Sequence, residues 1–148
     1  LPHRLEFVGE AGGVKYYDDS ISTTPESSIA AMRSFAAPKV LILGGSNKGA
    51  DWQEFASALS GEASLKAIIG IGEEWPRIKE AIFNNGQMNP RVQIVENMKT
   101  MPEVVGAAQG IAQSGDVVIL SPGCASFDMF KNYQDRGEQF AVAARALS

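Results

Sequence analysis

Short apolar runs alternate with amphipathic helical stripes along most of this chain, and this alternation restricts the fold more than any other feature. The apolar runs cover residues 40–43, 65–71, 92–95 and 117–120. Short runs of this kind are typical of strands that are buried on both faces of a sheet. Between the runs, apolar residues recur at helical spacing, as at Trp52, Phe55 and Leu59. Such a succession predicts a Rossmann-like α/β fold, with an open, mostly parallel sheet and helices on both faces.

The beginning of the chain departs from this pattern and predicts a hairpin. Residues 5–10 and 14–18 flank a short glycine-rich link, which is typical of two antiparallel strands joined by a tight turn. We expect this N-terminal hairpin to lie at the edge of the sheet. The first helix is expected to begin with Thr24 as N-cap and Pro25 at its first position, and to stop before Pro38.

Length, composition and charge limit the classes of protein that fit. The chain has 148 residues, a common length for one domain, so residues 1–148 are expected to form a single domain. A net charge of -4 without a Lys/Arg cluster argues against nucleic acid, and the short apolar runs argue against a membrane span. The lone cysteine, Cys124, excludes an internal disulfide and suits a reducing cytoplasm. The start at Leu1, with neither an initiator Met nor a signal segment, favours a piece of a longer protein.

Three polar loops follow predicted strands, at residues 18–24, 44–51 and 121–128. Because the carboxyl ends of parallel strands lie at one edge of a sheet, we expect these loops to converge on one crevice. Ser126 is expected to be the N-cap of a last helix that begins at Phe127. The polar side chains of the loops are Asp19, Ser20, Ser22, Thr23, Ser46, Asn47, Lys48 and Ser126. A lysine, several hydroxyls and helix N-termini suit a carboxylate or phosphate ligand.

Several familiar catalytic motifs are missing from the sequence. Residues 44–49 lack both the GxxxxGK(S/T) spacing of a phosphate-binding P-loop and the GxGxxG fingerprint of dinucleotide-binding proteins. One histidine, one cysteine and scattered carboxylates predict no metal site. A Ser-His-Asp triad would require His3, near the start, and is disfavoured. Cys124 is better interpreted as a small buried thiol than as a nucleophile.

Five short segments occur in a characteristic order along the chain. They are Leu1-Pro2-His3-Arg4-Leu5-Glu6, Asp19-Ser20 with Thr23, Leu43-Gly44-Gly45 with Lys48-Gly49, Leu120-Ser121-Pro122 through Lys131-Asn132, and Arg136-Gly137. Together they resemble the C-terminal domain of the Mur ligases, most closely the MurD type, which adds glutamate to UDP-N-acetylmuramoyl-L-alanine in peptidoglycan synthesis. The resemblance implies a bacterial, cytoplasmic enzyme of three domains, in which a UDP-sugar domain and a central P-loop ATPase domain lie outside this chain.

The resemblance also implies a chemistry and a set of site residues. ATP, with Mg²⁺, would phosphorylate the substrate carboxylate to an acyl phosphate, and the amine of glutamate would then displace phosphate. The implied glutamate ligands are Thr23 and Lys48 for the α-carboxylate, and Ser126, Phe127 and Tyr133 for the side-chain carboxylate. The residues implied to contact ATP are Arg4, Asp19 and His3. The missing central domain would hold most of the ATP and the Mg²⁺, so the chain alone is expected to be inactive.

Two positions depart from the family pattern. Ile21 stands where the family usually has lysine, and Ser46 stands where the Gly-Gly loop usually has an acidic residue. Both changes leave open whether the amino acid is D-glutamate or L-glutamate. The sequence also leaves open another Mur or folylpolyglutamate-type ligase, and a non-catalytic α/β module that binds a small anion.

Overall fold

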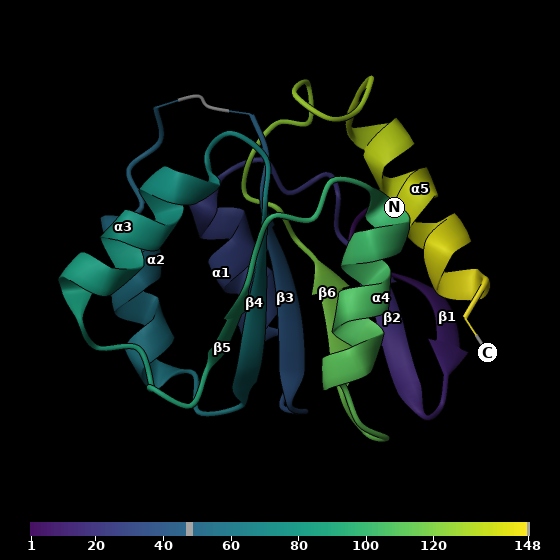
Figure 1. Ribbon diagram of the computed structural model, residues 1–148, viewed down its shortest axis with the longest axis horizontal. Helices are drawn as coiled ribbons and strands as arrows, with labels where there is room; N and C mark the ends of the chain where they lie inside the picture. The colour runs from purple at the N-terminus through teal and green to yellow at the C-terminus, as the bar shows by residue number, and fades with distance from the viewer. Residues whose placement is uncertain (47–48, 148) are drawn as a thin grey trace.

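A six-stranded sheet forms the centre of the protein in the computed structural model, which describes residues 1–46 and 49–147 (Figure 1). The strands are β1 (Glu6–Ala11), β2 (Val14–Asp18), β3 (Lys39–Gly44), β4 (Leu65–Ile71), β5 (Gln93–Val95) and β6 (Val117–Leu120). They lie in the order β1-β2-β6-β3-β4-β5, and every neighbouring pair is parallel except β1 and β2. The predicted α/β fold with an antiparallel hairpin at its edge is therefore confirmed.

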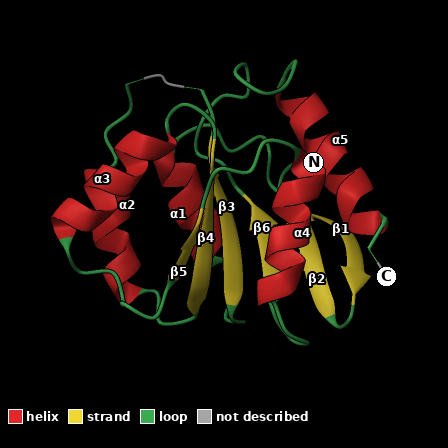
Figure 2. Cartoon of the chain, in the orientation of Figure 1, coloured by secondary structure: helices red, strands yellow, loops and turns green. Residues whose placement is uncertain are grey.

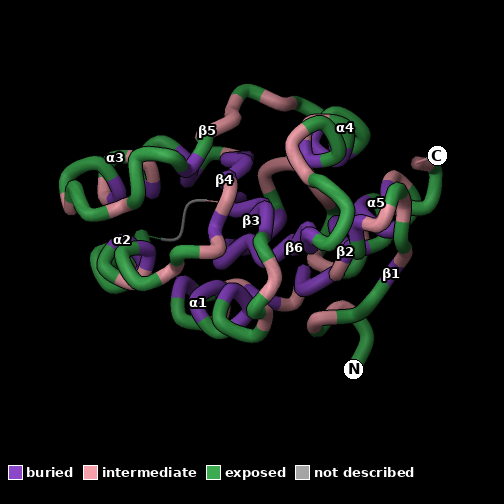
Figure 3. The backbone as a smooth tube through the Cα atoms, turned by 90° about the horizontal axis from the view of Figure 1, so that it is seen from below, coloured by how far each residue is buried: buried purple, intermediate pink, exposed green. Residues whose placement is uncertain are grey.

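Helices cover both faces of the sheet (Figure 2). They are α1 (Pro25–Arg33), α2 (Gln53–Ala58) with a 3-10 turn after it (Leu59–Gly61), α3 (Trp75–Asn85), α4 (Met101–Ile111) and α5 (Tyr133–Arg145). Helices α1, α2 and α3 pack on one face and α4 and α5 on the other, so the strands form a buried layer between them (Figure 3). Within the described residues, no helix combines the length and the apolar character needed to cross a bilayer.

The third strand shows why an unbroken apolar run becomes the middle of such a sheet. Every residue of β3 is buried. Leu41 and Leu43 belong to the core beneath α1, α2 and α3, whereas Val40 and Ile42 belong to the core beneath α4 and α5. Successive side chains of a strand point to opposite faces, so both faces of β3 must be apolar. Each such side chain contributes about 1.5–3 kcal/mol when it is fully buried.

The first helix begins and ends within the limits that the sequence predicts. Thr24 is its N-cap and accepts a hydrogen bond from Ser27 N at 3.3 Å, while Thr24 N donates to Ser27 Oγ at 3.3 Å. Pro25 occupies the first helical position, where a backbone N–H would have no acceptor within the helix, so its absence costs no hydrogen bond. The helix ends at Arg33 and so stops before Pro38, as the sequence predicts.

The last helix begins later than the sequence predicts. We expected Ser126 to cap a helix starting at Phe127, and that prediction is wrong. The helix α5 begins at Tyr133, and its N-cap is Asn132, whose side-chain oxygen accepts a hydrogen bond from Asp135 N at 2.7 Å. Between β6 and α5 the chain forms an irregular loop in which Phe127 is 71% exposed. The apolar positions therefore face the core only within α5, where Phe140 and Ala144 are buried, and not at Phe127.

The position of β6 determines where the sheet can bind a ligand. β6 pairs with β2 on one side and with β3 on the other. The strands β2 and β3, which are consecutive in the sequence and joined by α1, are therefore separated in the sheet by β6. The chain returns to β6 through α4, which lies on the opposite face of the sheet. Such a reversal of strand order leaves a crevice at the carboxyl ends of the strands. The loops after β2, β3 and β6 all lie at this edge, at the top of Figure 1.

Candidate functional site

Backbone hydrogen bonds join the loops that follow β2, β3 and β6. Ser46 N, in the loop after β3, donates to Ala125 O at 2.8 Å. Gly123 N, in the loop after β6, donates to Ser22 O at 3.0 Å in the loop after β2. The predicted convergence of the three loops is therefore confirmed, and the loop after β6 lies between the other two.

Gly45 allows the loop after β3 to approach the loop after β6 closely. Its φ of 156° is one that L side chains rarely adopt. A Cβ added to Gly45 would lie 2.3 Å from Ala125 O and 2.9 Å from Cys124 Cβ. A larger residue would therefore push apart the two loops that carry the predicted Lys48 and Ser126.

Two of the hydroxyl residues that are predicted to bind glutamate lie on adjoining loops. Ser126 is buried and Thr23 is half-buried. Their loops are hydrogen-bonded to each other, so the structure brings both residues to the same edge of the sheet. Phe127 follows Ser126 and is largely exposed, which leaves its ring outside the hydrophobic core.

The other predicted glutamate ligands lie farther along this edge or outside the described residues. Tyr133 begins α5 and is half-buried, and its carbonyl accepts a hydrogen bond from Ser20 Oγ at 2.7 Å. This bond places the first turn of α5 against the loop after β2. Lys48, the predicted cation, and Asn47 lie outside the described residues.

Asp19 connects the predicted ATP-contacting residues to the strand ends. Its Oδ1 accepts a hydrogen bond from Leu5 N at 3.1 Å, and its Oδ2 accepts one from Ser121 Oγ at 2.7 Å. Burial raises the pKa of this carboxyl, although the bonds from Ser121 and Leu5 and the charge of Arg4 oppose the rise. Arg4 itself is exposed. Asp19 thus holds the segment containing Arg4 against the loops after β2 and β6.

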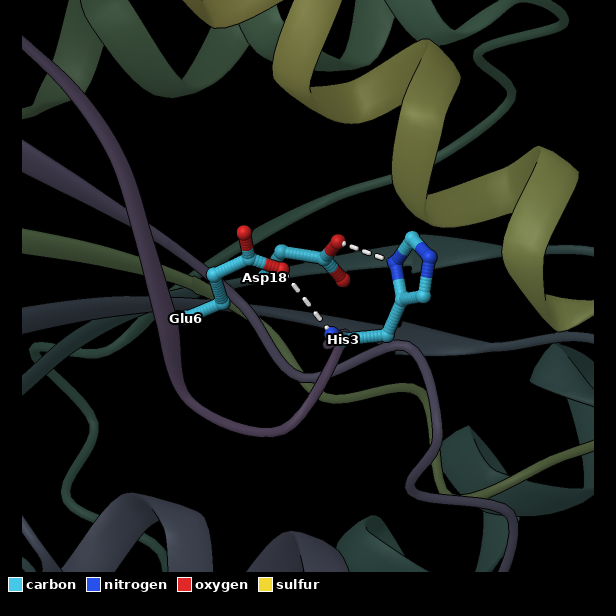
Figure 4. Close-up of side chains that lie close together, drawn as sticks. All are labelled: His3, Glu6 and Asp18. Atoms are coloured by element: carbon cyan, nitrogen blue, oxygen red, sulfur yellow. Dashed lines mark hydrogen bonds and ion pairs between the residues drawn. The ribbon is translucent and has the colours of Figure 1, made fainter. Parts of the chain in front are cut away.

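His3 lies in the segment before β1 and pairs closely with Asp18 at the end of β2 (Figure 4). Its Nδ1 lies 2.6 Å from Asp18 Oδ2, and its backbone N donates to Glu6 Oε1 at 2.9 Å. Burial raises the pKa of the Asp18 carboxyl, whereas hydrogen bonds from Ser20 N and His3 favour the charged form. The imidazole ring also meets the ring of Tyr133 edge-on, with 5.9 Å between centroids. These contacts fix the first residues of the chain to β2 and α5.

His3, Glu6 and Asp18 together offer three ligand atoms that lie within 4.8 Å of one another. The sequence did not predict this group, because Asp18 follows His3 by fifteen positions and approaches it only when β1 pairs with β2. The group suits Mg²⁺ poorly, since Mg²⁺ prefers oxygen ligands in octahedral geometry. The side chains of His3 and Asp18 are also hydrogen-bonded to each other already. We therefore assign no metal to this group.

A pocket of about 400 Å³ opens beside the loop after β6, and its lining includes Gly72, Lys99, Asp128 and Met129. Asp128 N donates to Ser46 Oγ at 3.1 Å. Ser46, which replaces the usual acidic residue, therefore meets a residue that carries a carboxylate of its own. Asp128 was not among the predicted site residues, because only the folded loops bring it next to Ser46.

A comparison with known families decides which family this arrangement represents. A family model described as "Mur ligase, glutamate ligase domain" matches residues 3–124. The chain belongs to this family. The match includes all six strands of the glutamate ligase domain and the loops after β2 and β3. The resemblance to the Mur ligase C-terminal domain is therefore confirmed.

Curated relatives match the glutamate ligase domain along nearly its whole length. A relative from Alkaliphilus metalliredigens is 41% identical over 147 residues, which is 99% of this chain and 31% of the relative. One from Clostridium perfringens is 41% identical over 139 residues, with 93% and 30% covered. One from Methylococcus capsulatus is 39% identical over 148 residues, with 100% and 30% covered. All three are named UDP-N-acetylmuramoylalanine–D-glutamate ligase, and the chain spans less than a third of their length.

Arg136, in α5, is a buried residue for which the sequence predicted no role. Its side chain is fully buried and donates to Ser20 Oγ at 2.8 Å, Ser20 O at 2.7 Å and Cys124 O at 2.9 Å. Its position in the sequence could have identified it. Arg136 lies at helical spacing from Tyr133 and from Phe140, which places it on the core-facing side of α5.

Proposed function

We propose that this chain is the glutamate-presenting domain of an ATP-dependent ligase that joins D-glutamate to UDP-N-acetylmuramoyl-L-alanine. The observation that carries the proposal is an identity of 39–41% with ligases named for this reaction, over 93–100% of the chain. The aligned region contains the three loops that meet at the carboxyl edge of the sheet. The bacterial relatives and the lone, buried Cys124 support a bacterial cytoplasmic enzyme.

The proposed reaction forms an amide bond in two steps. ATP transfers its γ-phosphoryl group to the carboxylate of UDP-N-acetylmuramoyl-L-alanine, which yields an acyl phosphate and ADP. The amine of glutamate then attacks the acyl carbon, loses a proton and displaces inorganic phosphate. We propose that other domains of the full-length enzyme hold most of the ATP and Mg²⁺. The role of this domain is to bind the glutamate and to orient its amine toward the acyl phosphate.

The proposed glutamate site uses one group of residues for each carboxylate. Thr23 and Lys48 would bind the α-carboxylate, and Ser126 would bind the side-chain carboxylate with Phe127 and Tyr133 beside it. Hydroxyl and ammonium donors at both ends of a dicarboxylate are what such a ligand requires. The contact between the loops after β2 and β6 supports this assignment, because it brings Thr23 and Ser126 to one edge.

The proposed ATP-contacting residues are Arg4, Asp19 and His3, which lie on or against the segment before β1. The hydrogen bond from Leu5 N to Asp19 supports this grouping, since it ties that segment to the loop after β2. The contact between His3 and Asp18 supports it in the same way. We propose that Arg4, the exposed cation of the three, reaches the ATP phosphates.

The relatives' names favour D-glutamate over L-glutamate as the amino acid. The test is a ligation assay with the full-length enzyme, ATP, Mg²⁺ and UDP-N-acetylmuramoyl-L-alanine, in which product and phosphate are both measured. We expect one phosphate per product with D-glutamate, much slower reaction with L-glutamate, and no turnover by the 148-residue chain alone. Efficient ligation of a diamino acid, or of glutamate to a folate, would instead place the enzyme elsewhere among related ligases.

A further inference from the structure

Arg136 carries a buried positive charge that forms no ion pair with a carboxylate among residues 1–46 and 49–147. Its side chain is 0% exposed, and its three hydrogen bonds go to Ser20 Oγ, Ser20 O and Cys124 O. In the part of the chain that the structure describes, no carboxylate oxygen lies within 4.0 Å of its nitrogens. Buried charges are normally paired, so an unpaired guanidinium in this position needs an explanation.

The guanidinium is hydrogen-bonded to two of the three loops at the carboxyl edge of the sheet and lies close to the third. It holds Ser20 in the loop after β2 and Cys124 in the loop after β6. In the loop after β3, a Cβ on Gly45 would lie 3.3 Å from Arg136 Nη1. Removing Arg136 would leave two buried backbone carbonyls without this donor, and the relative positions of the loops would no longer be fixed by a common partner.

The carboxylates whose charges act on Arg136 are hydrogen-bonded to other groups. Asp18 accepts hydrogen bonds from His3 Nδ1 and Ser20 N, and Asp128 accepts one from Glu73 N at 2.9 Å. Burial lowers the pKa of Arg136 to about 10, so the guanidinium stays protonated at neutral pH. A fixed positive charge beneath the loops, in surroundings of low dielectric, raises their affinity for anions at the surface.

We propose that Arg136 is a positioning residue for the incoming dicarboxylate. Its guanidinium sets the spacing of the loops that carry Thr23 and Ser126, and its charge favours an anion between them. The proposal rests on the proposed function, because it takes glutamate as the ligand. Arg136 itself lies beneath the site, does not touch the ligand, and acts through the loops that it holds.

A purely structural role and a positioning role predict different kinetics. If Arg136 served only stability, its substitution would lower the fraction of folded enzyme, which lowers kcat and leaves every KM unchanged. If it positions the glutamate loops, the KM for glutamate rises while the KM for the UDP-sugar substrate stays the same. The ratio of the two KM values therefore separates the two roles.

The test uses the full-length enzyme with Arg136→Lys and Arg136→Met. Lysine keeps the charge but lacks the planar guanidinium, whose three nitrogens each reach a different oxygen, and methionine removes both the charge and the hydrogen bonds. Lys39→Met is the matched control, because Lys39 is also 0% exposed but lies at the opposite end of β3, where its Nζ donates to Ser64 Oγ. Thermal unfolding is measured for every variant, and the kinetics are taken where each is folded.

We expect the KM for glutamate to rise about tenfold in Arg136→Lys and about a hundredfold in Arg136→Met, as expected from the loss of one to two charged hydrogen bonds. Lys39→Met should lose stability and keep its KM for glutamate within about twofold. If Arg136→Met does not fold, Arg136→Lys decides. A KM for glutamate within twofold of wild type in every folded variant, with wild-type enzyme active, overturns the positioning role alone. Wild-type enzyme that does not ligate glutamate overturns the proposed function, and the positioning role with it.

Discussion

Gly137 lies where α5 passes closest to the pair formed by His3 and Asp18, and its replacement by alanine should destabilise the domain. A Cβ added to Gly137 would lie 2.3 Å from His3 Nδ1 and 2.5 Å from Asp18 Oδ2. Neither atom belongs to a long, flexible side chain that could move aside, and the two already form a 2.6 Å contact with each other. The methyl group must therefore either separate this pair or displace α5.

Two contributions lower the free energy of unfolding of Gly137→Ala, and a third raises it. Overpacking costs about 1–3 kcal/mol, and the loss of a hydrogen bond to a charged group costs about 1.5–3 kcal/mol. Alanine is better than glycine within a helix by about 1 kcal/mol, which offsets part of the loss. The net decrease in the free energy of unfolding should be roughly 1.5–5 kcal/mol.

Urea unfolding of the domain, followed by circular dichroism, measures this difference. Gly106→Ala is the matched control, because Gly106 lies in α4, is exposed, and has nothing within 4 Å of an added Cβ. We expect the control to gain up to about 1 kcal/mol, while Gly137→Ala loses stability. A Gly137→Ala domain as stable as the control would refute the argument that this glycine is required by the approach of His3 and Asp18.

Three further predictions concern buried groups. Burial raises the pKa of the Asp19 carboxyl, so the folded domain binds the carboxyl proton more tightly than the unfolded chain does. The contribution of this group to stability therefore falls as the pH rises from its ordinary pKa to the raised pKa. The stability of Asp19→Asn relative to wild type, measured by urea unfolding, should therefore increase as the pH rises above about 4, the ordinary pKa of the carboxyl, and a difference that does not change with pH would contradict this. Cys124 is 4% exposed and should react with a thiol reagent at least about 100-fold faster in urea than in buffer; equal rates would show that it is accessible. Trp52 Nε1 donates to Glu74 Oε2 at 3.0 Å, so Trp52→Phe should lower the free energy of unfolding by about 1–3 kcal/mol. An unchanged free energy of unfolding would instead show that water replaces the indole N–H.

The strands could be predicted from the sequence because their signals are local. The run at residues 65–71 coincides with β4, and the run at 117–120 coincides with β6. The hairpin of β1 and β2 followed from its glycine-rich link. The start of α5 could not be predicted in this way, since Ser126 and Phe127 imitate an N-cap and a first apolar position. Only the folded loop shows that Asn132 is the cap.

The candidate site was predictable to the extent that it depends on sheet topology. Parallel strands bring their carboxyl ends together, so the meeting of the loops that carry Thr23 and Ser126 followed from the order of elements. The contact between His3 and Asp18 depends instead on how the chain turns before β1, where His3 and Leu5 have positive φ, and the hairpin pattern does not specify this turn. Arg136 was missed because an arginine in a helix is usually solvated, whereas its burial depends on the carbonyls of two distant loops.

The most direct test of the account is a crystal structure of the full-length enzyme with ADP, Mg²⁺ and D-glutamate. The account predicts that the amino acid lies at the carboxyl edge of this sheet, with one carboxylate at Thr23 and Lys48 and the other at Ser126. Its amine should point away from this domain, toward the nucleotide. A glutamate bound elsewhere, without contact to the loops after β2, β3 and β6, would contradict the central claim that this domain presents the amino acid.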